Sequence, residues 1–477
     1  MHTAFRRSSS ENQIIESKKT RCACFRFSNL ITCNFVKVAV SRKNADQLIL
    51  LDSRSIAARI ALAAAVLLAL VAAFFGVRWQ IGGMLAETAT PTDKNFAQVV
   101  RLAVDLAPHD PQVLWAAASA ERAGFSSDAA KRAEAALENT IRLSPNDYRF
   151  WLDLARTRDQ AGDASGAEAA FQKALERAPN NAFGRWLYGN FLLRAGERDR
   201  AFVEFRRVAE AHSSLRLQVF YLAWENIGEN PAQIESVVGD SPQVRAALAP
   251  FYAGKGKPED AVRLWRSLTP EQKEEFRLDG ESASRTLYEK QNFRAALDML
   301  RELGVEAPEV GQIQNPSFEG EITNSPDNFV GWRVQRLKGV DVALDAGQRK
   351  EGKRSLRLTF SGFAAPTLQA ATQYAGVESG ARYRLTFWVK TAGLKSAGPP
   401  VLEVVDARTT KALGSSQTFT GDTGGDWRMQ TVEFNVPPDV EAILIRTVRQ
   451  FCGENCPIVG IVWYDDFKLE RLGKTGK

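Results

Sequence analysis

Hydrophobic residues recur with two different periods along this chain, and the period changes near residue 313. Before this point, apolar residues follow the spacing i, i+4, i+7, as in Ala167, Phe171 and Ala174, which is typical of one face of a helix. After it, residues 382–390 alternate strictly between apolar and polar side chains, which is typical of a half-buried strand. The pattern therefore predicts an α + β multidomain protein in which a helical region precedes a β region.

The helical region contains an internal repeat. Pro111, Pro145 and Pro179 lie 34 residues apart, and each follows an apolar helical segment. Between Asp147 and Pro179, the stretch "AGDASG" separates two helical patterns, so each repeat is predicted to be a pair of helices. We expect four or five such pairs over residues 92–304, forming an α-α superhelix with a concave face.

The repeat unit resembles the tetratricopeptide repeat. Its first helix carries "WLDLA" and its second carries "AEAAFQKA", which match the W-x2-L-A and A-x3-F-x2-A positions of that family. Arg158 stands where the family usually has an aromatic residue. The resemblance implies a scaffold that docks a protein partner on the repeat concave face. Four tryptophans are expected to pack between helices rather than to contact a ligand, namely Trp115, Trp151, Trp186 and Trp265.

An uncharged apolar run, Ile60 to Val77, precedes the repeats and is long enough to cross a bilayer. We predict a single transmembrane helix over residues 56–79, with Trp79 as an interfacial anchor. A signal peptide has a shorter apolar core and a small-residue cleavage site. A helix of a soluble protein usually has a polar face, and this run has none. Both alternatives are therefore disfavoured.

The basic excess of the chain lies upstream of this run. Met1 to Arg59 holds eleven Lys and Arg against four Asp and Glu, a local net charge of +7, whereas the whole chain carries +6. The folded remainder therefore lacks the basic surface that nucleic-acid binding requires. The positive-inside rule places the N-terminus in the cytoplasm and the bulk outside an inner (cytoplasmic) membrane. We expect a bacterial protein whose bulk is periplasmic or otherwise extracytoplasmic. We expect the tail, residues 1–55, to be disordered, and one hypothesis is that the working chain begins near Ser41.

The β region, residues 313–473, holds many short alternating segments, which predict a β-sandwich. The motifs "NPSFEG", "EGKRSLRLTF", "GARYRLTFWVKT", "GDWRMQTVEFNVP" and "VWYDDFKLERL" occur in this order. Together they resemble the carbohydrate-binding module family of the cellulase C type (family 4/9). The resemblance implies a jelly-roll fold and a polysaccharide ligand, with Trp332 and Trp427 in the core.

Two kinds of site are expected in this module. Sugar recognition needs aromatic faces for stacking and planar polar groups beside them. The polar face of residues 382–390 offers Trp388 beside Arg384, and further candidates are Tyr374, Arg446 and Gln430. The resemblance also implies a structural Ca2+ tying the first strand to the last. The matching positions are Glu319, Asp465 or its neighbour Asp466, and the carbonyl of Lys353; the alternative is a carboxylate that accepts backbone hydrogen bonds.

The cysteines divide between the two sides of the predicted membrane. Three of them precede the apolar run, whereas Cys452 and Cys456 in "FCGENCP" lie on the oxidising side and are expected to form a disulfide. A zinc site is disfavoured because no histidine lies nearby in the sequence.

Catalysis finds little support in the sequence, and we expect no enzyme. The module contains no histidine, which removes the usual Ser-His-Asp and Cys-His arrangements there, and no phosphate-binding glycine pattern follows a strand. The sequence favours a membrane-anchored scaffold whose repeats dock a protein and whose sandwich binds glycan, in cell-envelope or exopolysaccharide assembly. Two alternatives stay open: a scaffold of protein–protein interactions without a sugar ligand, and an accessory glycoside hydrolase.

Overall fold

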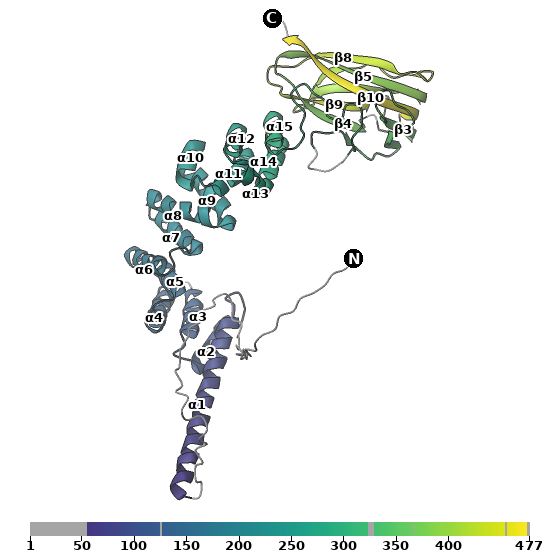
Figure 1. The fold of residues 1–477 in the computed structure, drawn as a ribbon. Helices are drawn as coiled ribbons and strands as arrows, with labels where there is room; N and C mark the ends of the chain where they lie inside the picture. Colours follow the sequence, from purple (N-terminus) through teal and green to yellow (C-terminus); the bar gives the residue numbers. More distant parts are fainter. Residues whose placement is uncertain (1–54, 125, 323–328, 366, 454–455, 475–477) are drawn as a thin grey trace, which may run out of the picture. The chain divides into compact units, whose positions relative to one another are not determined.

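The computed structural model describes residues 55–124, 126–322, 329–365, 367–453 and 456–474. The predicted disordered tail, residues 1–55, lies outside this part except for its last residue. The described residues contain fifteen helices followed by ten strands (Figure 1). The helices are α1 (Ile56–Thr88), α2 (Phe96–Leu106), α3 (Pro111–Arg122), α4 (Ser127–Leu143), α5 (Tyr148–Gln160), α6 (Ala164–Arg177), α7 (Ala182–Arg194), α8 (Arg198–Ala211), α9 (Ser213–Ile227), α10 (Pro231–Val238), α11 (Pro242–Gly254), α12 (Pro258–Arg266), α13 (Pro270–Glu275), α14 (Arg277–Glu289) and α15 (Phe293–Glu302).

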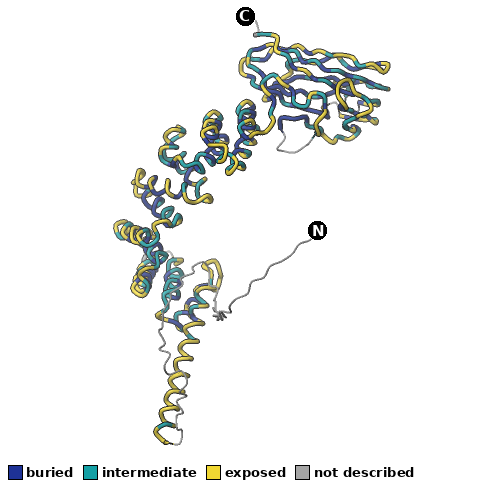
Figure 2. The backbone as a smooth tube through the Cα atoms, in the orientation of Figure 1, coloured by how far each residue is buried: buried dark blue, intermediate teal, exposed yellow. Residues whose placement is uncertain are grey.

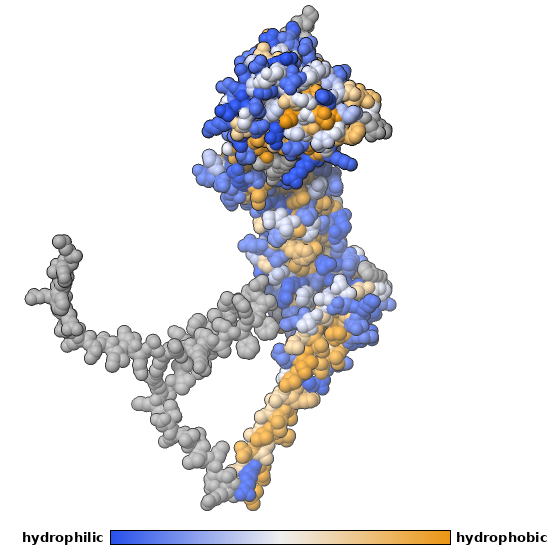
Figure 3. Space-filling view, turned by 90° about the vertical axis from the view of Figure 1, so that its right-hand side faces the viewer, coloured by the Kyte–Doolittle hydropathy of each residue, from blue (hydrophilic) through white to orange (hydrophobic). Residues whose placement is uncertain are grey.

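Helix α1 is long and apolar enough to be a membrane span or a signal sequence. Its apolar side chains form a continuous hydrophobic surface (Figure 3). The helix does not end at Trp79, as the apolar run predicts, but continues to Thr88. This last part packs against α2: Gly82 is buried, and a Cβ atom there would lie 2.7 Å from the Cβ of Ala107.

Helices α3 to α8 form antiparallel pairs, as the 34-residue period predicts. Each pair buries the small and aromatic residues of its motif; Ala155, Ala167 and Phe171 are all inaccessible to solvent. The buried residues of successive pairs form one continuous core along the repeats (Figure 2). The four tryptophans belong to this packing, because Trp265 is fully buried and Trp115, Trp151 and Trp186 lie against the core.

Two five-stranded antiparallel sheets form the predicted β-sandwich. One sheet has the strand order β1-β4-β9-β6-β7 and the other has the order β2-β3-β10-β5-β8. The strands are β1 (Arg333–Val334), β2 (Val340–Asp345), β3 (Ser355–Phe363), β4 (Ala371–Gly376), β5 (Ala381–Ser396), β6 (Pro400–Asp406), β7 (Ala412–Ser415), β8 (Arg428–Asn435), β9 (Ala442–Arg449) and β10 (Pro457–Lys474).

The core of the sandwich lies between the two sheets. The predicted inward face of β5 is confirmed, since Tyr383, Leu385, Phe387 and Val389 are all buried. Trp332 is also buried, and its ring centroid lies 4.8 Å from that of Phe467 on β10. The expectation for the second tryptophan was wrong: Trp427 lies in the loop before β8, is only partly buried and does not belong to the core, because its neighbours Asp426 and Arg428 are exposed and this loop lies at the surface.

An aromatic cluster joins the last repeat helices to the first of these sheets. The ring of Tyr374 on β4 stacks on Phe293 of α15 at a centroid distance of 5.2 Å and meets Tyr288 of α14 edge-on at 5.4 Å. Tyr288 in turn stacks on Phe329 at 4.4 Å. We call these four residues the junction cluster. Repeats and sandwich therefore share buried apolar surface.

Candidate functional site

The repeats carry a groove of about 590 Å³ on the side formed by α9, α11 and α14, the first helices of successive pairs. We call it the repeat groove, and its lining includes Arg216, Leu217, Tyr221, Phe251, Lys255 and Asp279. Leu217 and Tyr221 are 50% and 45% exposed, although both are apolar in most of their surface. Exposed apolar side chains that line a concave surface are typical of a binding site for another molecule.

Three charged groups of the repeat groove are incompletely paired. Nε of Arg216 donates to the backbone oxygen of Ala209 at 2.7 Å, and Nζ of Lys255 lies 4.8 Å from the centroid of the Tyr221 ring. Within the described part of the chain, neither Asp279 nor Lys255 forms an ion pair. Burial raises the pKa of the Asp279 carboxyl and lowers the pKa of the Arg216 guanidinium. The attraction between Arg216 and Asp279 opposes both pKa shifts but does not cancel the effect of burial.

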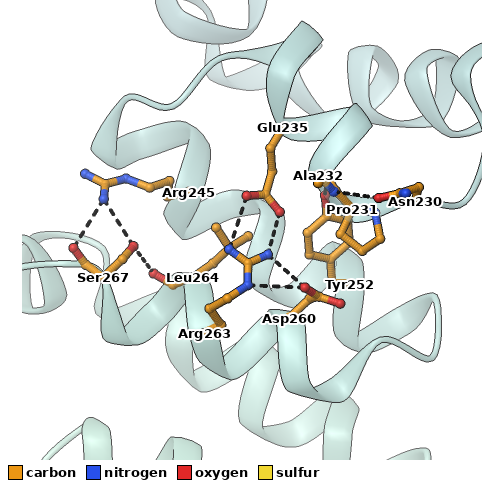
Figure 4. A network of polar contacts seen from close by, with 10 residues as sticks. All are labelled: Asn230, Pro231, Ala232, Glu235, Arg245, Tyr252, Asp260, Arg263, Leu264 and Ser267. Atoms are coloured by element: carbon orange, nitrogen blue, oxygen red, sulfur yellow. Dashed lines mark hydrogen bonds and ion pairs between the residues drawn. The ribbon is translucent and has the colours of Figure 1, made fainter.

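The helices behind the groove are held by a polar network (Figure 4). The hydroxyl of the buried Tyr252 on α11 donates to the backbone oxygen of Pro231 at 3.1 Å. Arg263 on α12 forms an ion pair with Glu235 on α10 at 2.6 Å and a second with Asp260 at 2.8 Å. These contacts hold α11, one of the three helices that line the groove, against α10 and α12.

A second groove, of about 550 Å³, lies in the sandwich beside β1 and the loop from β3 to β4. We call it the sandwich groove, and its lining includes Gln335, Lys338, Phe363, Ala364, Thr367 and Gln369. Phe363 is 64% exposed, so its ring offers a free face. An exposed ring beside two planar amides is the combination that sugar recognition uses.

The sandwich groove was not predicted from the sequence. The sequence gives one sign of this groove. The buried apolar residues of β3 are Leu356, Leu358 and Phe360, so Phe363 is an apolar residue at a position of the exposed face. The groove itself depends on how β1 pairs with β4 and on the loop between β3 and β4, and neither arrangement follows from a local pattern.

The five residues predicted to bind sugar do not form one site. Trp388 and Arg384 lie on the outer face of the sheet that contains β5, and Gln430 lies on the neighbouring strand β8, opposite Phe387. Nζ of Lys350 lies 4.1 Å from the centroid of the Trp388 ring, so a cation covers one face of it. Arg384 is paired with a carboxylate of the same face, Glu433, at 2.6 Å.

Tyr374 and Arg446 lie on the other sheet, on β4 and β9. Tyr374 belongs to the junction cluster, where Phe293 and Tyr288 contact its ring. Arg446 is paired with Glu403 of β6 at 2.9 Å. A single sugar therefore cannot contact these two residues and Trp388 together, because the thickness of the sandwich separates them.

The predicted calcium ligands lie around one loop, residues 348–354. Oε1 of Glu319 accepts hydrogen bonds from the backbone N–H groups of Lys353 at 2.7 Å and Arg354 at 3.2 Å. Oδ2 of Asp465 accepts from the N–H groups of Lys350 at 2.7 Å and Glu351 at 3.0 Å. The loop thus directs backbone N–H groups at these carboxylates, whereas a calcium ion would need oxygen atoms from the loop.

Asp465 is fully buried and its second oxygen, Oδ1, accepts from the backbone N–H of Asp466 at 2.8 Å. Within the described residues, no group of three or more His, Cys, Asp or Glu side chains is placed to hold a metal ion. In this arrangement the residues do not fit calcium, and they match the alternative of carboxylates that accept backbone hydrogen bonds. Calcium binding stays a prediction of the resemblance.

The structure joins Cys452 and Cys456 in a disulfide between β9 and β10. Cys456 is buried, whereas Cys452 is partly exposed. The preceding residue, Phe451, is 81% exposed.

Comparison with known proteins finds a family match for part of the repeats. Residues 125–182 match the family model of the tetratricopeptide repeat. Among solved structures, a CBM4 structure is similar over 34% of this chain and 99% of its own, with 16% identity and a TM-score of 0.26. The CBM22-1 xylan-binding domain from Paenibacillus barcinonensis Xyn10C is similar over 35% and 100%, with 16% identity and a TM-score of 0.23.

A Stig cyclase, Fisc from Fischerella sp. TAU, is similar over 34% of this chain and 98% of its own, with 17% identity and a TM-score of 0.25. These likenesses are to the fold alone, and binding and enzymatic proteins both occur among them. No curated protein matches the sequence.

Proposed function

We propose that this protein is a membrane-anchored scaffold whose repeats dock a protein partner through the repeat groove. The observation that carries the proposal is the groove itself, a hollow with two exposed apolar side chains and charges without full partners. The match to the tetratricopeptide repeat supports a role in protein–protein interaction. Helix α1 would hold the scaffold at the membrane surface.

The groove suits an extended peptide segment. Its apolar lining, Leu217 and Tyr221, would bury a hydrophobic side chain of the partner. Arg216 and Lys255 would meet a carboxylate, and Asp279 would meet a basic group. For Arg216 and Asp279, a bound charge would replace hydration that burial has removed. We therefore expect a partner segment in which charged residues flank an apolar one.

Site-specific photocrosslinking from the full-length chain in its native membrane tests this proposal. A crosslinking residue at Leu217 is expected to capture one protein repeatedly, and the capture should be lost in the Tyr221→Glu variant. The matched control places the crosslinker at Val203 on α8, which is 53% exposed and does not line the groove. Equal capture from both positions, or no capture from Leu217, contradicts docking in this groove.

A second function, glycan binding, is proposed for the sandwich groove. Phe363 would stack on the apolar face of a sugar ring, while Gln335 and Gln369 would bond to its hydroxyl groups. The sequence motifs shared with carbohydrate-binding modules support this proposal. With a membrane anchor and a protein partner, the setting would be the assembly of cell-envelope or exported polysaccharide outside the cytoplasm.

Titration of the full-length chain, solubilised in detergent, against a panel of glycans tests the second function. Phe363→Ala is expected to abolish binding, since it removes the exposed ring. Phe451→Ala is the matched control, because Phe451 is also exposed but does not line the groove. Loss of binding in Trp388→Ala alone would instead place the sugar on the outer face of β5, away from the sandwich groove. No binding to any glycan would leave a scaffold of protein interactions, and turnover of a glycan would favour the hydrolase alternative.

A further inference from the structure

The disulfide lies against a buried arginine that has no acidic partner among the described residues. Arg449 on β9 is 4% exposed, and its guanidinium donates to neutral acceptors and to one cysteine sulfur. Nε donates to the backbone oxygen of Gly398 at 3.0 Å, and Nη1 donates to the backbone oxygens of Ala364 and of Cys456, the latter at 3.0 Å. Nη2 donates to Oγ of Ser396 at 2.9 Å, to the backbone oxygen of Pro457 at 3.2 Å and to Sγ of Cys456 at 2.9 Å.

These contacts satisfy the donors of Arg449 but leave its charge uncompensated. Within the described residues Arg449 forms no ion pair, and burial lowers the pKa of its guanidinium. A buried cation without an anion is unfavourable in a medium of low dielectric constant. An anion created within hydrogen-bond distance would therefore be stabilised there, and Sγ of Cys456 is the atom in this position that reduction turns into an anion.

The two sulfurs differ in accessibility. Cys456 is buried, and Cys452 is partly exposed. Gly398 closes one side of the disulfide, since a Cβ atom at that position would lie 2.5 Å from Sγ of Cys452 and 2.9 Å from Sγ of Cys456. Cys452 is therefore the more accessible of the two residues for attack by an external thiol, and the sulfur that would leave is that of Cys456.

We propose that Cys452–Cys456 is a redox-active disulfide that exchanges with a dithiol reductant, with Arg449 holding the departing Cys456 thiolate. A thiolate of the reductant attacks Sγ of Cys452, the bond between the two cysteines breaks, and its electron pair leaves with Sγ of Cys456. The second thiolate of the reductant then attacks the first sulfur of the reductant, which is bonded to Sγ of Cys452 in the mixed disulfide. This step closes the disulfide of the reductant and releases Cys452 as a thiolate that takes a proton from water. Two electrons pass from the reductant to this protein.

Arg449 affects this exchange in two ways. A leaving thiol that is more acidic leaves faster, and a disulfide whose reduced form is stabilised is a stronger oxidant. Ordinary structural disulfides of exported proteins resist reduction, because nothing stabilises their thiolates. The contact between Arg449 and Cys456 thus separates this disulfide from a purely structural one.

The first measurement is the ionisation of Cys456 in the full-length chain. Cys22, Cys24 and Cys33 are replaced by Ser, and Cys452→Ser leaves Cys456 as the single thiol. The ultraviolet absorbance of its thiolate, followed against pH, is expected to give a pKa below about 8.5, the value of a free cysteine. A pKa at or above that value overturns the proposal, because burial without stabilisation by Arg449 raises the pKa of a thiol.

The second measurement is the equilibrium of the intact disulfide with dithiothreitol, quantified by alkylation and mass spectrometry. Arg449→Gln is expected to lower the equilibrium constant for reduction of the disulfide by at least about tenfold. This corresponds to a fall of about 30 mV in the reduction potential for a two-electron couple. Arg446→Gln is the matched control, since it makes the same change on the same strand at an arginine that pairs with Glu403 and not with a cysteine, and it should leave the equilibrium unchanged.

An unchanged equilibrium in Arg449→Gln overturns the proposal. If that variant does not fold, the ionisation of Cys456 decides the question alone. Glu454 lies between the two cysteines in the sequence and outside the described residues. Glu454→Gln tests whether its carboxylate neutralises Arg449, and a large effect of this variant on the equilibrium would also overturn the role given to the arginine.

Discussion

Glu319 shows at the scale of one residue how a backbone contact stabilises a loop. Its carboxylate accepts N–H groups of Lys353 and Arg354, and the hydrogen bond from Lys353 lowers the pKa of Glu319 most. A carboxyl group whose pKa is lowered by folding stabilises the fold above its pKa in the unfolded chain. That contribution is lost as the pH falls through the pKa of the folded state. Acid therefore releases the loop from Glu319.

Glu319→Gln is expected to lower the unfolding temperature of the sandwich near neutral pH. The difference from the parent should shrink towards zero at an acid pH below the lowered pKa of the folded state, where the parent carboxylate is itself protonated. Thermal unfolding at the two pH values measures this. The matched control is Glu321→Gln, which removes an exposed ion pair with Arg354 but no backbone hydrogen bond. Equal destabilisation at both pH values would contradict a role for the charge.

The same unfolding experiment tests the predicted calcium ion. The loop offers N–H groups to Glu319 and Asp465, so addition of calcium is not expected to raise the unfolding temperature. A rise with calcium that disappears in Glu319→Gln would show that the loop rearranges to expose carbonyl oxygens, as the resemblance implies.

At the scale of secondary-structure elements, Asp153 joins neighbouring repeats. It is buried on α5 and accepts from Nε1 of Trp115 at 2.5 Å and from Arg122 at 2.7 Å, both on α3. Asp153→Ala would leave both donors without their partner. We expect it to lower the free energy of unfolding of the repeats by about 1–3 kcal/mol. Urea denaturation followed by circular dichroism measures the loss.

Asp159→Ala is the control for this prediction. Asp159 lies on the same helix and pairs with Arg194 of α7 at 2.5 Å, but the arginine is largely exposed to water. Its loss should cost less than about 1 kcal/mol, because solvent screens exposed ion pairs. Similar costs for the two variants would show that the contact between α3 and α5 does not depend on Asp153.

The helices and strands were largely predictable because their patterns are local. Each repeat buries its motif against its own partner helix, so Ala155 and Phe171 reveal the pair within 34 residues. The alternation of β5 likewise shows its buried face. The substitution at Arg158 also has a local reason, since its guanidinium pairs with Glu134 and Glu138 of α4, both at 2.8 Å.

The candidate sites were less predictable because they depend on contacts between distant elements. The order of strands decides which side chains share a face, so Tyr374 and Trp388 lie on different sheets although both fit a sugar site by residue type. Phe363 becomes part of a groove only when the loop from β3 to β4 folds beside β1. No periodicity in the sequence carries that information.

At the scale of the molecule from α2 onward, the junction cluster makes the end of the repeats depend on the sandwich. Phe293 is almost fully buried between Tyr288 and Tyr374. Phe293→Ala is expected to cost about 3–5 kcal/mol, the range for a buried phenylalanine. Cleavage by trypsin at Arg301 should then become faster, because α15 loses its contact with β4.

Mass spectrometry of the proteolytic fragments measures this effect. Phe183→Ala is the control, since Phe183 lies on α7 and is largely exposed. It should change neither the fragments nor their rate of appearance. If Phe293→Ala leaves the rate of cleavage at Arg301 as in the parent, α15 is stable without the sandwich, and the cluster does not couple them.

The junction cluster also has a consequence for how such a protein can evolve. Gene fusion and recombination usually exchange modules that fold alone, with the crossover in a linker between them. A crossover near Gly304 would leave Tyr288 and Phe293 facing water in one product and Tyr374 in the other. Both products would carry an exposed aromatic patch that favours aggregation. The last helix pair and the sandwich are therefore expected to be inherited together, and a viable exchange of modules would have its crossover among the earlier repeats.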